Sequence, residues 1–330
     1  MLHTIGKYVA FAALGVSALS AASAQSIKGT INLPGTPEDV AVNYLTNRIY
    51  VAIPSFGGPT DTLAVIDGNT DTLIQSISIP TVGYTVAVDT VRNLVYVGGC
   101  FEDVNGLNRC EVAVVNGKQN SLAQTIPVTT SQGNGIQGLT VNQITGTVYV
   151  SNASDNVIDV IEPGAKAVCS TISLAGESPV GVAVNPFTNQ VYVALSNDLV
   201  DVIDGRKKTI VATATVGTSN ANVASNWLSG NVFVVNSVEG ISTVGVLNSK
   251  GGNVATVAVG NTPFGVDVDL ATNLAFVTNI IDNSVSVING KTNTVSATLP
   301  VSGTFVAVNP ATAKVYVSGQ ANQLIVLNEQ

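Results

Sequence analysis

Apolar and polar positions alternate in one recurring pattern along almost the whole chain. A short run of Val and Ala ends in Asn or Asp, a turn that often contains Thr-Asn follows, and an aromatic residue then stands between two apolar ones. These aromatic residues lie 40 to 53 residues apart and are Tyr50, Tyr96, Tyr149, Tyr192, Phe233, Phe276 and Tyr316. A period of about 40–45 residues with four short strands in each unit is typical of β-propeller blades.

The repeat around Tyr192 shows the four strands most clearly. The pattern predicts strands over residues 180–185, 190–195, 199–203 and 209–216. The turn before the last strand begins with Asp204-Gly205 and recurs as Asp67-Gly68, Asn116-Gly117, Pro163-Gly164 and Asn289-Gly290. We expect these glycines to supply a positive φ, which glycine adopts without a Cβ penalty.

The first strand of each repeat is apolar at nearly every position, which suits a sheet covered on both faces. Valines alternate there with small residues, namely Ala41, Ala87, Ala183, Ala224 and Ala307. A small face against a large face lets neighbouring blades interdigitate without voids. The polar residues that end these strands are expected to cap turns, because every repeat has one: Asn43, Asp89, Asn142, Asn185, Asn226, Asp269 and Asn309.

The two ends of the chain complement each other. The seventh repeat stops after a third strand at 324–327, whereas Ser26–Leu33 matches the fourth strands in pattern. Pairing the two would close a ring and leave no unpaired inner edge. The sequence therefore predicts an all-β, seven-bladed β-propeller over residues 25–330, with four-stranded antiparallel blades and an N-terminal strand that completes the last blade.

Short motifs strengthen this prediction. Val148-Tyr149-Val150-Ser151-Asn152, Val232-Phe233-Val234-Val235-Asn236 and Ala275-Phe276-Val277-Thr278-Asn279 resemble the YVTN motif of the YVTN-repeat propeller family, which includes YncE-like proteins. The segments Val202–Gly205 and Val287–Gly290 are also similar to that family. The resemblance covers essentially the whole chain after residue 24, and it implies an exported binding or interaction protein.

Residues 1–24 have the pattern of a signal peptide. Lys7 precedes an apolar stretch over 8–19, and Ala22-Ser23-Ala24 offers small residues for cleavage after Ala24. No later apolar run reaches the ~18 residues that a spanning helix needs, so no membrane span is expected. The sequence predicts a periplasmic or secreted protein, and we expect a monomer.

Removal of this segment leaves twelve basic and 21 acidic residues, a net charge of −9. The sequence therefore disfavours binding to nucleic acid, because that affinity arises from clustered cations. The segment also contains the only histidine, His3. Haem ligation, imidazole zinc sites and the His-dependent chemistry of lyase-like and lactonase-like propellers are then disfavoured.

Three insertions lengthen the loops of adjacent repeats, at 54–61, 99–109 and 129–136. The topology places all three on one face, and binding residues favour loops on a rigid scaffold. We therefore expect a ligand or partner site on this rim, for an unknown protein, glycan or small molecule. The candidates are Phe56, Tyr84, Phe101, Glu102, Asp103, Asn105, Arg109 and Asn134. Tolerated variation in loop length is the alternative.

The three cysteines divide into a pair and a single residue. Cys100 ends one strand and Cys110 begins the next, and facing residues in antiparallel strands lie within disulfide reach. We predict a Cys100–Cys110 disulfide. Cys169 falls in the last strand of the third repeat and is expected to be a buried, inert thiol.

Asp267 stands at a position that is Ala or Thr in the other repeats. A carboxylate there should lie near the central channel, partly buried, as a ligand-facing acid or as a water-bound structural residue. Trp227 lies in a turn on the face opposite the insertions, where it could anchor a partner or fold over its blade.

The leading hypothesis is an exported, non-catalytic binding scaffold, with no catalytic residue, metal or cofactor assigned. Asp103, Asn105 and Gly106 have a faintly calcium-like spacing, but the EF-hand order is absent and a polar turn is expected. One alternative is a hydrolase or lyase-like propeller enzyme that uses carboxylates at the channel mouth. The other is a purely structural cell-envelope protein.

Overall fold

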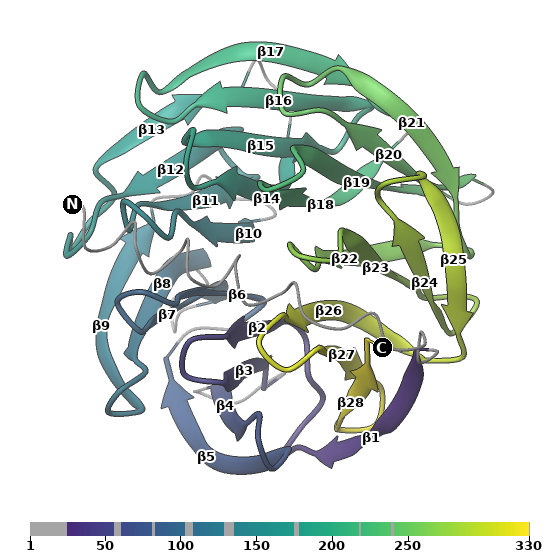
Figure 1. Ribbon diagram of the computed structural model, residues 1–330. Coiled ribbons are helices and arrows are strands. Elements are labelled where there is room, and N and C mark those ends of the chain that lie inside the picture. Colours follow the sequence, from purple (N-terminus) through teal and green to yellow (C-terminus); the bar gives the residue numbers. More distant parts are fainter. Residues whose placement is uncertain are drawn as a thin grey trace.

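A computed structural model describes residues 25–55, 61–80, 83–102, 108–128, 135–174, 178–217, 219–238 and 241–329. The described residues form 28 strands in seven antiparallel four-stranded sheets and contain no helix. The sheets are arranged as blades around a central channel, which defines a seven-bladed β-propeller (Figure 1). The predicted fold class is confirmed.

We name the strands of each blade a to d, counting outward from the channel. Blade 1 contains β2 (Val40–Asn43), β3 (Arg48–Ile53), β4 (Asp61–Asp67) and β5 (Thr72–Ile79). Blade 2 contains β6 (Thr85–Asp89), β7 (Leu94–Glu102), β8 (Asn108–Asn116) and β9 (Ser121–Val128). Blade 3 contains β10 (Ile136–Val141), β11 (Val148–Asn152), β12 (Val157–Ile161) and β13 (Ser170–Ser173). Blade 4 contains β14 (Pro179–Asn185), β15 (Gln190–Leu195), β16 (Leu199–Asp204) and β17 (Thr209–Thr215).

The remaining blades follow the same order. Blade 5 contains β18 (Asn220–Asn226), β19 (Asn231–Val238), β20 (Ile241–Leu247) and β21 (Asn253–Ala258). Blade 6 contains β22 (Pro263–Val268), β23 (Leu274–Asn279), β24 (Ser284–Asn289) and β25 (Thr294–Leu299). Blade 7 contains β26 (Gly303–Asn309), β27 (Lys314–Gly319), β28 (Gln323–Asn328) and the N-terminal β1 (Ser26–Asn32).

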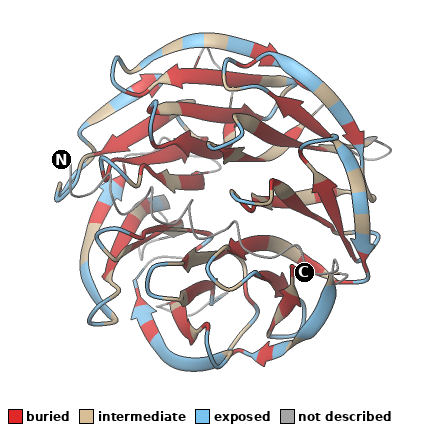
Figure 2. Ribbon diagram, in the orientation of Figure 1, coloured by how far each residue is buried: buried red, intermediate tan, exposed pale blue. Residues whose placement is uncertain are grey.

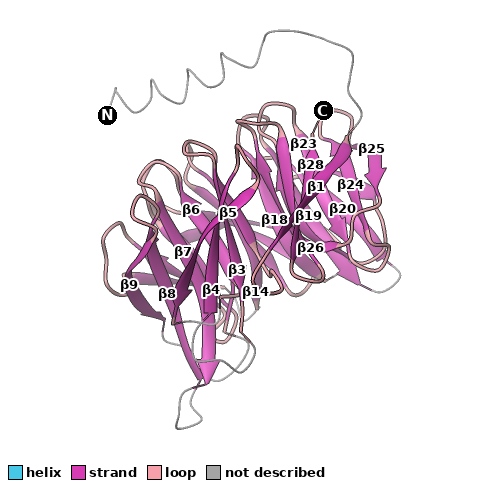
Figure 3. Ribbon diagram, turned by 90° about the horizontal axis from the view of Figure 1, so that it is seen from below, coloured by secondary structure: helices cyan, strands magenta, loops and turns pink. Residues whose placement is uncertain are grey.

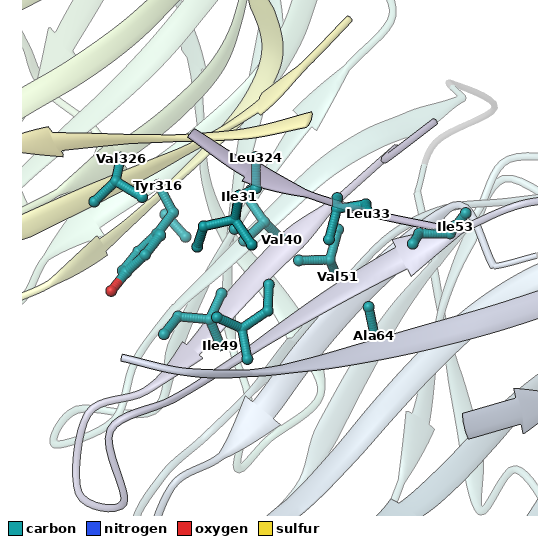
Figure 4. Packing of buried hydrophobic residues seen from close by; sticks show 12 residues of the cluster. Ile31, Leu33, Val40, Ile49, Val51, Ile53, Ala64, Tyr316, Leu324 and Val326 are labelled. Carbon is teal, nitrogen blue, oxygen red and sulfur yellow. The ribbon is translucent and has the colours of Figure 1, made fainter. Parts of the chain in front are cut away.

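The first described strand closes the ring. β1 pairs antiparallel with β28, with Ile31 opposite Leu324. Ile31 and Leu33 pack with Val40 of blade 1 and with Tyr316 of blade 7, so the closing core joins both ends of the circle (Figure 4). The innermost strands β2 and β26 are also in contact. The predicted closure by an N-terminal strand is confirmed.

The hydrophobic core lies between blades. All seven repeated aromatic residues are buried, and six of them rank among the largest fully buried side chains. Figure 2 shows buried residues throughout the inner strands, whereas strands such as β5 and β17 at the circumference are mostly exposed or half-buried. The outermost strand of a blade faces water on one side, which explains its greater exposure.

Asparagine and aspartate side chains hold the a–b turns. Each strand-a cap accepts a hydrogen bond, at 2.7–3.2 Å, from the backbone N–H two residues later. Four caps also donate to an asparagine of the next blade, and one of these bonds, Asn309 Nδ2 to Asn47 Oδ1 at 2.7 Å, spans the ring closure. The predicted caps therefore also connect neighbouring blades.

We predicted that the glycines of the c–d turns adopt a positive φ, and this prediction is wrong for most of them. Gly68 and Gly117 do not adopt a positive φ; Asp71 and Asn120 do so in the same turns. A Cβ on Gly68 would instead collide with the side chain of Asn47. Glycine is required there because an asparagine of the adjacent a–b turn passes too close for a side chain, which sequence spacing does not reveal.

The strands run between two faces of the molecule (Figure 3). The a–b and c–d connections form one face, which we call the turn face. The b–c and d–a connections form the other, which we call the loop face. The described strand ends that flank the three predicted insertions lie at the loop face.

Candidate functional site

The central channel is the main candidate site. A cavity of about 590 Å³ runs along all seven a strands and is open at the axis of the ring. Among the described residues that line it, the charged side chains are Glu38, Asp39 and Asp267, and none is a lysine or arginine. The channel is therefore an acidic environment within an apolar wall of Val and Ala.

Aromatic residues gather where the channel meets the loop face. Phe264 and Phe305 pack edge to face with ring centroids 5.2 Å apart. Tyr84, on the adjoining part of the mouth, is 37% exposed. Each of these rings comes from the first residues of an a strand or the residue just before it, so the propeller geometry brings them to one mouth. Exposed aromatic faces beside carboxylates suit an amphipathic cation.

Asp39 and Asp267 each connect two blades through backbone hydrogen bonds. Asp39 accepts bonds from the N–H groups of Val40 and Val86, both at 2.8 Å. Asp267 accepts bonds from Val268 and Val308, again at 2.8 Å. Strand a is the inner edge of its sheet, so these N–H groups have no ladder partner and need an acceptor.

The channel raises the pKa of its carboxyl groups. Desolvation is the largest cause for Asp39, whose pKa rises to about 7 although the bonds from Val86 and Val40 oppose the shift. Desolvation likewise raises the pKa of Asp267 to about 6. The pKa of Glu38 is raised by burial as well. Burial therefore moves the pKa values of Asp39 and Asp267 close to neutral pH.

The other mouth of the channel carries a second aromatic group. Phe187 and Trp227 contact each other with ring centroids 4.9 Å apart, and Tyr44 lines the same end. Trp227 is partly buried in this contact, in agreement with a side chain folded against the adjacent blade. It is less available as an isolated anchor than the sequence alone suggests.

The structure describes only some of the predicted site residues. Tyr84 and Asp267 both line the channel. Phe101 and Arg109 face each other across β7 and β8, and Glu102 ends β7. Phe56, Asp103, Asn105 and Asn134 lie outside the described residues.

The cysteine predictions have different outcomes. Cys100 and Cys110 form the predicted disulfide, at a Cα–Cα distance of 4.0 Å, and Cys100 also lines the channel. The expectation of a buried Cys169 is wrong, because this residue is a free, exposed thiol. β13 begins only at Ser170, and Cys169 ends a longer c–d connection instead of lying within the strand.

Asp39 lines the channel but is not among the site residues predicted from the sequence. The equivalent residues of the other blades are Thr85, Gly138, Gly181, Asn222, Gly265 and Phe305. A comparison of the repeats by column therefore shows Asp39 as the only acidic residue in a mixed column. The same comparison singled out Asp267. The sequence did not reveal that Asp39 accepts hydrogen bonds from two blades. One donor is Val40 of its own blade, and the other is Val86 of the next blade.

Within the described part of the chain, no group of three or more His, Cys, Asp or Glu side chains is placed to hold a metal ion. The described residues also contain no helix long and apolar enough to cross a membrane.

The fold and channel define a β-propeller protein, and the comparisons add only the fold. No protein-family model and no curated protein matches the chain. A solved structure titled Kuenenia stuttgartiensis Hydrazine Synthase is similar, with a TM-score of 0.75 and 16% sequence identity. The match covers 94% of this chain and 98% of that chain.

Proposed function

We propose that the protein is a non-catalytic binding scaffold whose ligand, a small organic cation, enters the central channel from the loop face. The observation that carries the proposal is the composition of the channel wall: three carboxyl groups, three aromatic rings at one mouth and no described lysine or arginine. A cation over an aromatic face gains about 0.5–2 kcal/mol, and a nearby carboxylate adds charge attraction.

The rim over blades 1–3 belongs to the same proposal. The disulfide fixes the base of the blade 2 loop, and Cys100 reaches the channel wall beside Ile136. The rim would then contact the part of the ligand that extends beyond the mouth. The YVTN-like motifs and the leader-like segment support membership of the YVTN-repeat family and export, as parts of this proposal.

Calorimetry with matched ligands tests the charge requirement. Benzylamine, choline and spermidine would be compared with neutral isosteres of the same shape, such as benzyl alcohol for benzylamine. We expect the cations to bind and the neutral isosteres to bind at least tenfold more weakly. Equal affinity for a cation and its neutral isostere would contradict the proposal.

Variants can be chosen from the repeat itself. Asp267→Ala and Asp39→Gly introduce residues that other blades carry at the same positions, so the fold should tolerate them. Each should weaken cation binding several-fold. Asp282→Asn removes an exposed carboxylate from the loop face outside the channel and serves as the control. Unchanged binding by the folded double variant Asp39→Gly/Asp267→Ala would exclude the channel.

A further inference from the structure

Most connections of the turn face have the same length, which favours a level surface. The a–b turns leave four residues between strands in most blades, for example 44–47 and 186–189, and the c–d turns do the same at 68–71 and 290–293. The described connections of the loop face vary more in length. A level face can contact an extended surface through several blades at once.

Exposed apolar side chains occupy one repeated position on this face. They stand two residues after the strand-a cap in five consecutive blades, with exposed fractions between 38% and 52%: Leu45, Val91, Ile144, Phe187 and Leu228. The backbone N–H of each is held by its cap, so each occupies the same place in its turn. Single exposed apolar residues are ordinary, but five at one position around the channel mouth form a patch.

Basic residues are concentrated on the same face. Of the twelve lysines and arginines in the described residues, only Arg109 lies toward the loop face. Five exposed ones stand in c–d connections and have no ion pair within the described residues: Lys118, Lys166, Arg206, Lys250 and Lys291. They lie farther from the axis than the apolar patch because strands c and d are the outer strands.

The acidic residues of the turn face are largely neutralised. Asp67 is paired with Arg48 at 2.7 Å, Asp71 with Lys314 at 2.8 Å, and Asp89 with Arg92 at 2.9 Å. Asp269 and Glu329 are buried. The unpaired lysines and Arg206 therefore give this face a positive potential.

The loop face has the opposite character. Asp155, Asp198 and Asp282 are exposed in its b–c turns, and Glu38 and Asp39 lie at its mouth. Strands of about six residues separate the faces by roughly 20 Å, more than twice the ~8 Å screening length at physiological salt. A partner in contact with the turn face is therefore attracted or repelled mainly by the cations of that face. The negative charge of the loop face is screened at this distance.

We propose that the turn face docks on the surface of an anionic lipid bilayer. The cationic periphery would contact the headgroups, while the apolar patch would enter the boundary between headgroups and acyl chains. The charge complementarity argues for an anionic partner, and the repeated aliphatic positions favour a lipid surface over a nucleic acid, whose backbone offers phosphates but no apolar layer. Docking in this orientation leaves the loop-face mouth of the channel open to water.

Vesicle co-sedimentation measures the docking directly. Purified protein is mixed with phosphatidylcholine vesicles that contain or lack phosphatidylglycerol, at increasing salt. We expect binding only to the anionic vesicles, with affinity that falls as salt rises. Trp227, the only tryptophan of the chain, lines the channel at the turn face, so quenching of its fluorescence by brominated lipid reports the orientation.

Charge variants show whether vesicle affinity depends on the cations of the turn face or on the net charge of the protein. Lys118→Gln/Lys250→Gln/Lys291→Gln removes three cations from the turn face, and at roughly fivefold per residue the affinity should fall about a hundredfold. Asp155→Asn/Asp198→Asn/Asp282→Asn changes the net charge by the same amount on the loop face and should change the affinity less than threefold. Equal and opposite effects of the two variants would overturn the proposal in favour of net charge.

Apolar variants test the patch. Leu45→Ser/Ile144→Ser/Leu228→Ser should reduce binding about tenfold and abolish quenching of Trp227. The control Ile74→Ser/Val211→Ser/Val254→Ser removes similarly exposed residues, at 45%, 51% and 53%, from outer strands. Binding without Trp227 quenching, equal loss in both variants, or capture of a soluble polyanion such as heparin with no vesicle binding would each refute docking on a bilayer.

Discussion

Replacement of Ile31 by Ala tests whether the N-terminal strand completes the ring. Ile31 is 5% exposed in β1 and packs in the core shared by blades 7 and 1. Ile77 of β5 is 6% exposed and has the same role between blades 1 and 2, so Ile77→Ala is the matched control. The two strands differ in attachment, because β5 is connected to folded blades at both ends and β1 only at one.

The expected magnitude follows from the burial. An Ile to Ala change in a core costs about 2–5 kcal/mol. The unfolding entropy of a domain of this size is roughly 0.6 kcal/mol/K, so each variant should lower Tm by about 3–8 °C. In Ile31→Ala the same loss also weakens a strand that can detach alone. Amides of β28 that face β1 should therefore exchange roughly thirtyfold or more faster, whereas Ile77→Ala should leave them near the parent rate.

Calorimetry would measure the change in Tm. Hydrogen exchange, followed by mass spectrometry on peptides that cover Gln323–Asn328, would measure the opening of β1. A Tm that drops for Ile77→Ala and stays unchanged for Ile31→Ala would refute the closure, because a side chain in the closing core cannot be removed without cost. Equal exchange of β28 in both variants would show that β1 does not open separately.

Three further outcomes are expected. Because the pKa values of Asp39 and Asp267 rise to about 7 and about 6, the folded protein holds protons that the unfolded chain releases near pH 4. The stability from these groups is full below pH 4 and is lost as pH rises through about 6 for Asp267 and about 7 for Asp39, at roughly 3 and 4 kcal/mol respectively. Urea titrations should show this slope, and Asp39→Gly/Asp267→Ala should flatten it. Cys100→Ala/Cys110→Ala opens a loop with a separation of 10 residues and should lower the free energy of unfolding by about 3 kcal/mol, measured by urea unfolding. Cys169 should react with a thiol reagent in the folded protein as fast as after unfolding, and a protected thiol would contradict its exposure.

The fold could be predicted from the repeat because several local signals agree. Strand β15 has the predicted bounds of 190–195, and β1 ends one residue before the predicted limit at Leu33. Caps, turn residues and the buried aromatic position specify the same boundaries in each blade, and this consistency across levels makes the pattern informative.

The candidate site was harder to predict because its contacts run between blades. The bond from Val86 to Asp39 joins residues 47 positions apart, and the collision that requires Gly68 involves Asn47 of another turn. Cys169 was misplaced for a different reason, since the longer c–d connection of blade 3 shifts the start of β13. The net charge of −8 also conceals the asymmetry between the faces, which becomes visible only when the lysines are sorted by their position in the repeat.

The two faces differ in how their unusual residues are distributed, and this difference constrains what each can bind. Asp267 is the only acidic residue in its column, and Asp39 is the only acidic residue in a column that otherwise holds Thr, Gly, Asn and Phe. Together they create a unique arrangement that suits a small ligand without sevenfold symmetry. The apolar residues of the a–b turns, such as Leu45 and Leu228, recur from blade to blade. Recurrence offers no unique geometry to a small molecule, but a planar surface meets these five blades alike and gains from each repeated contact. The single acidic residues thus favour a small ligand at the loop face, and the repeated apolar residues favour an extended surface at the turn face. Because screening separates the two faces, one can be occupied without excluding the other.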